Sequence, residues 1–99
     1  GPPELVIEIV SPWGASRDQI IKRRIYEKKG VAEYWIAHPS DKLLWKYVLA
    51  GGSYGKPEIY DNNDTPSAAV LPELTLDLLK VFGPTEEVKM PSPEKYRRF

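Results

Sequence analysis

Residues 5–10, LVIEIV, decide how this chain folds. Five of these six residues are apolar, four of them are β-branched, and polar and apolar positions do not alternate. A continuous apolar run is typical of a strand that is buried on both faces, so we predict a strand in the middle of a sheet. The next segment, 11–14 (SPWG), ends this strand, because proline cannot donate to a sheet ladder and glycine permits a turn.

A helix is predicted directly after this turn, over residues 16–29. Ser16 suits the N-cap, and Gly30 is the type of residue that commonly follows the last helical turn. The apolar side chains of this segment fall on one helical stripe, which consists of Ile20, Ile21, Ile25 and Tyr26. Residues 31–37, VAEYWIA, form the next predicted strand. Strand, helix and strand joined by short connections make a βαβ unit, with parallel strands and a right-handed crossover.

The rest of the chain extends this unit. Residues 43–49 and 54–60 flank a turn that contains two glycines, which predicts an antiparallel hairpin. Thr75 precedes an apolar segment that ends at Phe82, which predicts a capped final helix. The predicted fold class is α/β: a mixed sheet with a central parallel βαβ unit, an antiparallel hairpin extension and a short C-terminal helix.

Length and composition limit the classes of protein that the chain could represent. Its 99 residues allow one domain, and we assign residues 1–83 to that core and residues 84–99 to a polar, proline-containing tail. The chain has no cysteine and one histidine, which excludes a disulfide scaffold, thiol catalysis and a Cys/His metal cage. No apolar run approaches the roughly 20 residues that span a bilayer, so we expect a cytoplasmic protein that does not enter membranes.

Charge is balanced over the whole chain, with 14 basic and 14 acidic residues. An electrostatic function must therefore be local. The predicted helix is the basic stretch of the sequence, and Arg17 and Arg23 within it are candidates for contact with a nucleic-acid backbone. More commonly, such residues form the solvated face of a surface helix.

Glu8 is the most informative polar residue, because it lies within the apolar run 5–10. Burying an unpaired carboxylate in a protein interior costs about several kcal/mol of folding free energy. Glu8 could therefore ligate a metal or act in acid–base chemistry, or it could form a structural pair with a basic side chain of the helix. Glu4 lies on the same face of the predicted strand but nearer its end.

The helix offers a complement to Glu8. Asp18, Lys22 and Tyr26 recur at four-residue intervals, so they line one helix face. Lys22 could stabilise an anion that gathers near Glu8. The alternative is an exposed Asp18–Lys22 pair without a further role.

Aromatic residues are frequent on the predicted strands, and core packing accounts for them better than stacking on nucleic-acid bases. They are Trp13, Tyr34, Trp35, Trp45, Tyr47 and Tyr54. His38 follows a predicted strand with no second metal ligand near it in sequence, and we interpret it as a loop histidine without a catalytic role.

Three segments in order resemble the Uma2 family, also called DUF820. They are PELVIEIVSP at 3–12, the Asp18-x-x-x-Lys22-x-x-x-Tyr26 spacing, and GVAEYW at 30–35. The family is assigned to the PD-(D/E)XK restriction-endonuclease-like superfamily. The resemblance therefore implies a restriction-endonuclease-like core and metal-dependent hydrolysis of phosphodiester bonds in DNA.

The resemblance also implies roles for individual residues. Glu8 matches the acidic residue of the (D/E)XK element, which makes it a metal ligand and a catalytic residue. Val10 stands where the superfamily often has its lysine, and Lys22 matches the family lysine that substitutes for it. Asp18 and Tyr26 match the positions on either side of that lysine and are possible supporting residues.

Two positions depart from the family pattern: Glu4 replaces a common aspartate, and His38 replaces another. The family's metal-binding aspartate belongs to an earlier strand with a Pro-Asp element, and this sequence starts after it. The implied Mg²⁺ or Mn²⁺ site is therefore incomplete, with Glu8 as the well-placed acid and Glu4 or Asp18 as weaker substitutes.

Two functions follow as expectations. The first is the C-terminal core of a metal-dependent endonuclease that acts on DNA, inactive as this chain alone. The second is a non-catalytic module that oligomerises or binds nucleic acid. In either case we expect a homo-oligomer, most simply a dimer, because an unpaired apolar strand edge favours pairing with another copy.

Overall fold

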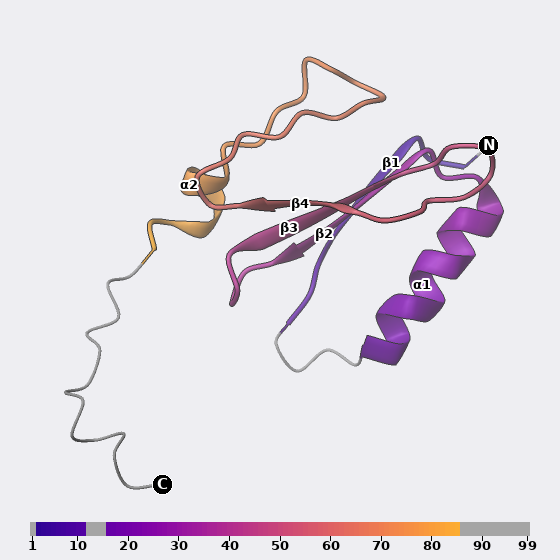
Figure 1. Ribbon diagram of the computed structural model, residues 1–99, viewed down its shortest axis with the longest axis horizontal. Helices are drawn as coiled ribbons and strands as arrows, with labels where there is room; N and C mark the ends of the chain where they lie inside the picture. The colour runs from indigo at the N-terminus through magenta and orange to yellow at the C-terminus, as the bar shows by residue number, and fades with distance from the viewer. Residues whose placement is uncertain (1, 12–15, 86–99) are drawn as a thin grey trace, which may run out of the picture.

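The computed structural model describes residues 2–11 and 16–85, and its elements confirm the predicted α/β class (Figure 1). They are β1 (Leu5–Ile9), α1 (Ser16–Lys29), β2 (Glu33–His38), β3 (Leu43–Val48), β4 (Glu58–Asp61) and α2 (Leu78–Phe82). In the described part of the chain, no helix is both long enough and apolar enough to cross a membrane. The tail expected over residues 84–99 lies outside the described residues from residue 86 onward.

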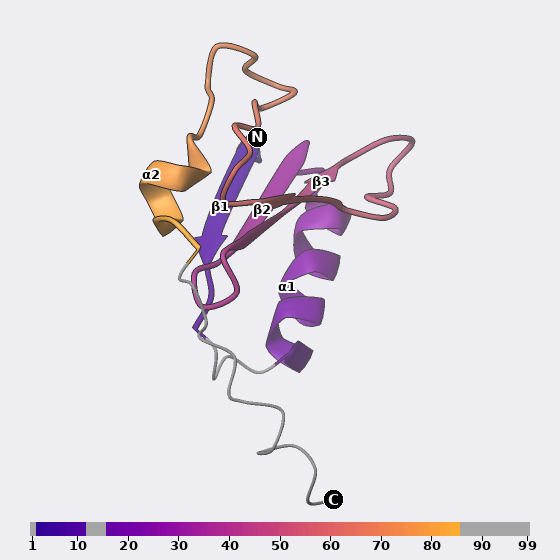
Figure 2. The ribbon, with the colours of Figure 1, turned by 60° about the vertical axis from the view of Figure 1, so that its left-hand side comes forward.

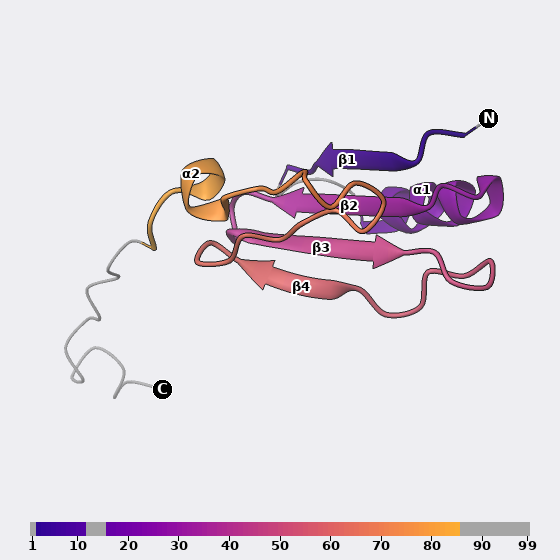
Figure 3. The ribbon, with the colours of Figure 1, turned by 90° about the horizontal axis from the view of Figure 1, so that it is seen from above.

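The sheet has the strand order β1-β2-β3-β4, with β1 parallel to β2 and the other neighbours antiparallel (Figure 3). β1 is therefore an edge strand of the described sheet, and the prediction that it lies in the middle is wrong. Ile7 and Ile9 are 40% and 76% exposed. An apolar run shows that a strand can be buried, but it does not fix the position of the strand in the sheet. Among the described residues, β1 has a neighbouring strand on one side only.

α1 crosses from β1 to β2 and covers one face of the sheet (Figure 2). Gly30 ends it with a positive φ of 78°. The N–H of Gly30 donates to the Glu27 carbonyl, and the N–H of Val31 donates to the Tyr26 carbonyl. This pair of hydrogen bonds is a Schellman motif, which satisfies two carbonyls that would otherwise lack partners.

Tyr26 of the predicted stripe packs against the buried cluster on this face of the sheet, and polar groups make further contacts between α1 and the sheet. Arg23 reaches Tyr47 on β3, and Tyr26 reaches Glu8 on β1. The isoleucines of the predicted stripe are at least two-fifths exposed, and they are Ile20, Ile21 and Ile25. Helical periodicity places residues on a common face, but it does not say which face meets the sheet.

α1 and α2 lie on opposite faces of the sheet (Figure 2), and a hydrophobic cluster lies on each face. The cluster under α1 contains Tyr34, Ile36, Tyr47 and Tyr54. The other cluster is covered by α2 and the segment that precedes it, and it contains Trp35, Ala37, Leu44, Ala68 and Leu78. Alternation along β2 therefore supplies both cores.

The hairpin forms, but with a longer connection than predicted. Gly51 and Gly52 take positive φ angles inside an Ala50–Ser53 bridge, which confirms the turn. β4 starts at Glu58 rather than at Tyr54. The Tyr54 N–H donates to the Glu27 carboxylate and its hydroxyl donates to the Val31 carbonyl, so the connection is held against the end of α1.

The last helix starts later than predicted. Thr75 pairs with Ser67 in an isolated bridge, so its backbone is extended there. Asp77 is the N-cap instead, and its carboxylate accepts a hydrogen bond from the Leu79 N–H at 3.1 Å. α2 buries Leu78 against the sheet.

Replacing the N-cap residue should destabilise the domain. We expect Asp77→Ala to lower the free energy of unfolding by about 1 kcal/mol, because a Leu79 N–H loses its acceptor. Thr75→Ala is the matched control and should change it by less than about 0.5 kcal/mol. Urea denaturation measures both values, and a larger effect at Thr75 would contradict this assignment of the cap.

Candidate functional site

Glu8 lies on the face of the sheet that α1 covers, and two phenols hold its carboxylate. Tyr26 of α1 donates to Oε1 at 2.9 Å, and Tyr34 of β2 donates to Oε2 at 2.9 Å. The Glu8 side chain is 18% exposed. A carboxylate within an apolar strand thus receives one hydrogen bond on each oxygen, which offsets much of its desolvation.

Lys22 completes this cluster from the neighbouring turn of α1. Its Nζ lies 3.7 Å from Oε2 of Glu8, and its side chain is 49% exposed. The side chains of Glu8, Lys22 and Tyr26 therefore lie together. The pair is neither internal nor tightly locked, because a half-exposed lysine at this distance contributes little to stability.

A pocket opens beside this pair, with a volume of about 160 Å³. It is lined by Glu8, Ile9, Val10, Ser11, Asp18, Gln19 and Lys22. Asp18 therefore lies at the same pocket as Glu8 and Lys22, as the helical spacing predicted. The pocket is where a small ligand could meet the carboxylate and the ammonium together.

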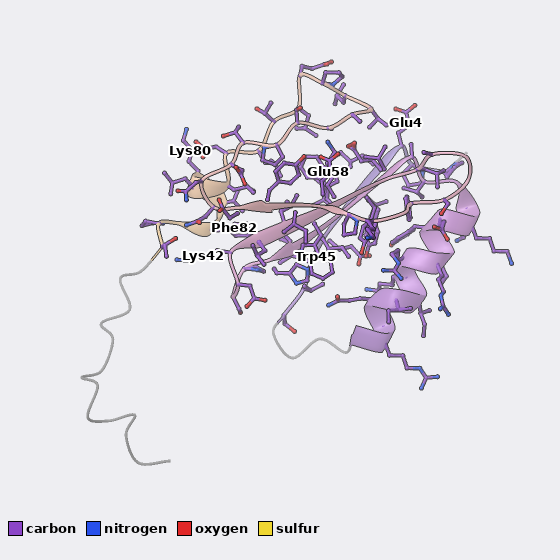
Figure 4. The ribbon with its side chains drawn as sticks, viewed as in Figure 1. Glu4, Lys42, Trp45, Glu58, Lys80 and Phe82 are labelled. Carbon is purple, nitrogen blue, oxygen red and sulfur yellow. The ribbon has the colours of Figure 1, made fainter. Side chains whose placement is uncertain are left out.

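Glu4 is not part of this pocket. It precedes β1, is exposed, and lies four residues from Glu8, a distance of roughly 13 Å along a strand. Figure 4 shows it at the start of β1, away from Trp45. Asp18 lines the pocket with Glu8, whereas Glu4 does not.

Tyr34 is the site residue that the sequence analysis missed, since it was interpreted only as a core aromatic. It is completely buried, and its ring packs against Tyr26 and Tyr47 while its hydroxyl meets Glu8. Parallel pairing sets Tyr34 opposite Val6, two residues before Glu8. That register is the signal that could have identified it.

The pKa values of both phenols are raised from the ordinary value for tyrosine. The hydrogen bond to Glu8, followed by burial and the charge of Glu8, raises the pKa of Tyr26. Burial is the largest cause of the raised pKa of Tyr34, and the hydrogen bond and charge of Glu8 add to it. Both hydroxyls therefore stay protonated and remain donors to the carboxylate over the physiological range.

The two basic residues selected for nucleic-acid contact differ in their surroundings. Arg17 is exposed. Arg23 is half-buried, donates to the Tyr47 hydroxyl at 3.2 Å and lies 5.5 Å from the centre of the Tyr47 ring. Contact of either residue with nucleic acid stays a prediction.

The aromatic residues mostly belong to the two cores, as predicted. Trp45 is only half-buried, and Trp13 lies outside the described residues. His38 is the last residue of β2 rather than a loop residue, and its ring centre lies 4.8 Å from that of Trp45. Burial lowers the pKa of His38, and the Asp41 charge partly opposes this effect.

The described residues bring two carboxylates, Glu8 and Asp18, to the pocket. No group of three or more His, Cys, Asp or Glu side chains that could hold a metal occurs among residues 2–11 and 16–85. Mg²⁺ often binds through one or two carboxylates and completes its shell with water and phosphate oxygens. The Glu8 oxygens keep further lone pairs beside their phenol bonds. Glu8 and Asp18 thus suit such an ion as a partial ligand set.

Comparison with protein families identifies the chain. Residues 1–79 match the family model described as "Uma2: Putative restriction endonuclease". The chain belongs to the Uma2 family.

Solved structures include a similar chain, the crystal structure of a putative nuclease of DUF820 from Anabaena variabilis. The TM-score is 0.66 at 22% sequence identity, and the match covers 81% of this chain and 44% of that one. This likeness shows a shared fold, and the Uma2 chain described here spans less than half of the related protein. The comparison with curated proteins found no match.

Removing the buried phenol should weaken this Uma2 domain. We expect Tyr34→Phe to lower the free energy of unfolding by about 1–2 kcal/mol, because Glu8 loses its buried donor. Tyr26→Phe is the matched variant and should cost less, because water can replace a hydroxyl at the more exposed position. Urea denaturation at neutral pH measures both, and equal values would contradict the dominance of Tyr34.

Alkaline pH provides a second test. The pKa of Tyr34 is raised above the 10.0 of the unfolded chain, so its contribution to stability is complete below that pH and is lost above it. We expect stability to fall as the pH rises above about 10, and to fall less steeply in Tyr34→Phe. Parallel slopes in the two proteins would show that Tyr34 ionises normally.

Proposed function

We propose that this Uma2 chain forms the part of a metal-dependent DNA endonuclease that carries the acidic residue Glu8 and the catalytic lysine Lys22. The observation that carries the proposal is the cluster in which Lys22 lies 3.7 Å from a carboxylate that two phenols hold at the edge of a pocket. Family membership supports the same reaction class.

Each side chain of the cluster has a role in this proposal. Glu8, with Asp18 beside it, would hold Mg²⁺ or Mn²⁺, and a bound divalent ion supplies charge neutralisation and an activated water at a phosphodiester. Lys22 stabilises negative charge that develops on the phosphate during attack. Tyr26 and Tyr34 orient the Glu8 carboxylate and stay protonated while they do so.

Full activity requires ligands beyond those of the described residues. At most two carboxylates line the pocket in the part of the chain that the structure describes. The chain also spans 44% of the related nuclease-like protein. We therefore propose that this chain alone binds the ion weakly and cleaves DNA poorly, and that a longer Uma2 protein supplies the missing acid.

Nicking of supercoiled plasmid DNA tests this function. We expect a longer protein that contains this chain to nick DNA with Mg²⁺ or Mn²⁺ and to stop when EDTA removes the metal. Glu8→Gln and Lys22→Met should each lower the rate by about 100-fold or more, because each removes charge stabilisation at the reacting phosphate. Unchanged nicking in both variants would overturn the assignment.

The control for this experiment is Lys28→Met. Lys28 is an exposed lysine of the same helix, so its loss changes the net charge as Lys22→Met does without touching Glu8. Metal binding by the 99-residue chain provides a readout that needs no turnover. Calorimetric titration with Mn²⁺ should show weak binding that Glu8→Gln removes and Lys28→Met preserves.

A second candidate function is a non-catalytic module that oligomerises or binds nucleic acid. The observation that favours it is the outer edge of β1, which has no paired strand among the described residues and exposes Ile7 and Ile9. An open apolar edge promotes strand pairing between chains. DNA binding that survives EDTA and Glu8→Gln would also favour this module.

Sedimentation tests the oligomer. We expect a dimer at micromolar concentration, and Ile9→Lys should dissociate it by placing a charge at the β1 edge. Ile59→Lys is the control, because Ile59 is a similarly exposed isoleucine on β4 at the other side of the sheet. A monomeric wild-type protein would contradict the prediction.

A further inference from the structure

A second hollow lies under the N-terminal half of α1, on the side of β3. Its volume is about 290 Å³, near the lower end of pockets that hold small ligands. It is lined by Gln19, Ile20, Arg23, Ile36, Trp45 and Tyr47. None of the catalytic roles proposed above uses this hollow, which we call the Trp45 pocket.

The Trp45 pocket adjoins the pocket at Glu8. Gln19 lines both of them. The sheet register also connects them, because Glu8 pairs with Ile36 and Ile36 pairs with Trp45. Paired residues point to the same face, so Glu8 and Trp45 lie two strand spacings apart, roughly 10 Å. One or two nucleotides of a DNA strand can bridge that separation.

The walls of the Trp45 pocket combine aromatic and cationic groups. Trp45 is half-buried, whereas Tyr34 and Tyr47 beside it are buried in the core. The Arg23 guanidinium packs over the Tyr47 ring. Aromatic faces together with a guanidinium are the combination that holds unpaired bases in single-strand binding proteins.

Unsatisfied polar atoms gather on the same side of the sheet. Among the described residues, three buried side-chain nitrogens lack a hydrogen-bond partner. Two of them are Nε1 of Trp45 and Nε2 of His38, which belong to rings in contact with each other. Buried polar groups usually have partners. Trp45 lines the pocket, and its indole N–H has no acceptor among the described residues.

The charge around the Trp45 pocket favours a polyanion. α1 carries six basic residues and two acidic residues, although the whole chain is neutral. Lys22 and Arg23 are neighbours on this helix, with Lys22 directed to Glu8 and Arg23 directed to Tyr47. The cations therefore follow the path from one pocket to the other, as a phosphate backbone requires.

We propose that the Trp45 pocket binds one unpaired nucleobase of a DNA strand, next to the phosphate that is presented to Glu8 and Lys22. The inference rests on the proposed nuclease function and specifies its substrate as single-stranded or locally opened DNA. A base within an intact duplex is paired along one edge and stacked on both faces, so it cannot enter a pocket without leaving the helix.

Binding of a short single-stranded oligonucleotide tests the proposal. A fluorescein-labelled strand and the same strand with abasic sites are titrated with the protein in EDTA, and fluorescence anisotropy reports binding. We expect the strand with bases to bind about tenfold more tightly, because stacking of one base on an aromatic ring gives a factor of that size. Equal binding of the two strands would overturn the proposal.

Variants locate the effect. Trp45→Leu should abolish the preference for bases and Trp45→Phe should retain most of it, since phenylalanine still offers a ring. Arg23→Gln should weaken binding more than Arg24→Gln, a matched change at an exposed neighbour. If Trp45→Leu fails to fold by circular dichroism, the two arginine variants decide the outcome. A preference that survives both Trp45→Leu and Arg23→Gln would refute the site.

Nicking and the preference for bases test the nuclease function and the base pocket separately. Glu8→Gln should leave the preference for bases unchanged, because stacking does not use the carboxylate. If Glu8→Gln stops nicking but normal and abasic strands bind equally, the base pocket alone is refuted. If the protein prefers strands with bases but Glu8→Gln nicks DNA at the wild-type rate, the nuclease assignment is refuted and the base pocket is supported.

Discussion

The hydrogen bonding of the Glu8 carboxylate is the constraint on which the site depends. One side chain of β1 accepts from Tyr26 of α1 and from Tyr34 of β2, so it joins three elements of the βαβ unit. A carboxylate in an apolar strand would be costly without such partners. α1 supplies one of these partners through Tyr26, while its isoleucines stay partly exposed.

The two faces of the sheet are packed differently. The face under α2 is closed by apolar packing around Trp35, and its buried acid, Glu33, accepts the Ala69 N–H and so fastens the covering segment. The face under α1 is hollowed on both sides of the helix. The polar groups that line these hollows, Glu8 and Lys22 among them, lie on this second face, which is the face of the proposed substrate site.

Much of the site could be predicted from the chain. The spacing of Lys22 and Tyr26 places both on one helix side, and an acid in an apolar strand requires partners, so their meeting with Glu8 follows from local rules. Tyr34 could not be found this way, because its role arises from the register between β1 and β2. The position of β1 at an edge and the late start of β4 depend likewise on contacts between distant segments.

By itself, the amino-acid order determined the strands, the helices and the crossover between parallel strands, because hydrophobic periodicity, glycine and proline act over a few residues. It also marked the acid and the lysine. Only the tertiary structure decided which side of α1 faces the sheet, which tyrosines hold Glu8, and that Trp45 borders a hollow instead of filling the core. These features depend on how segments far apart in the sequence pack together, and a pattern of a few residues does not specify that packing.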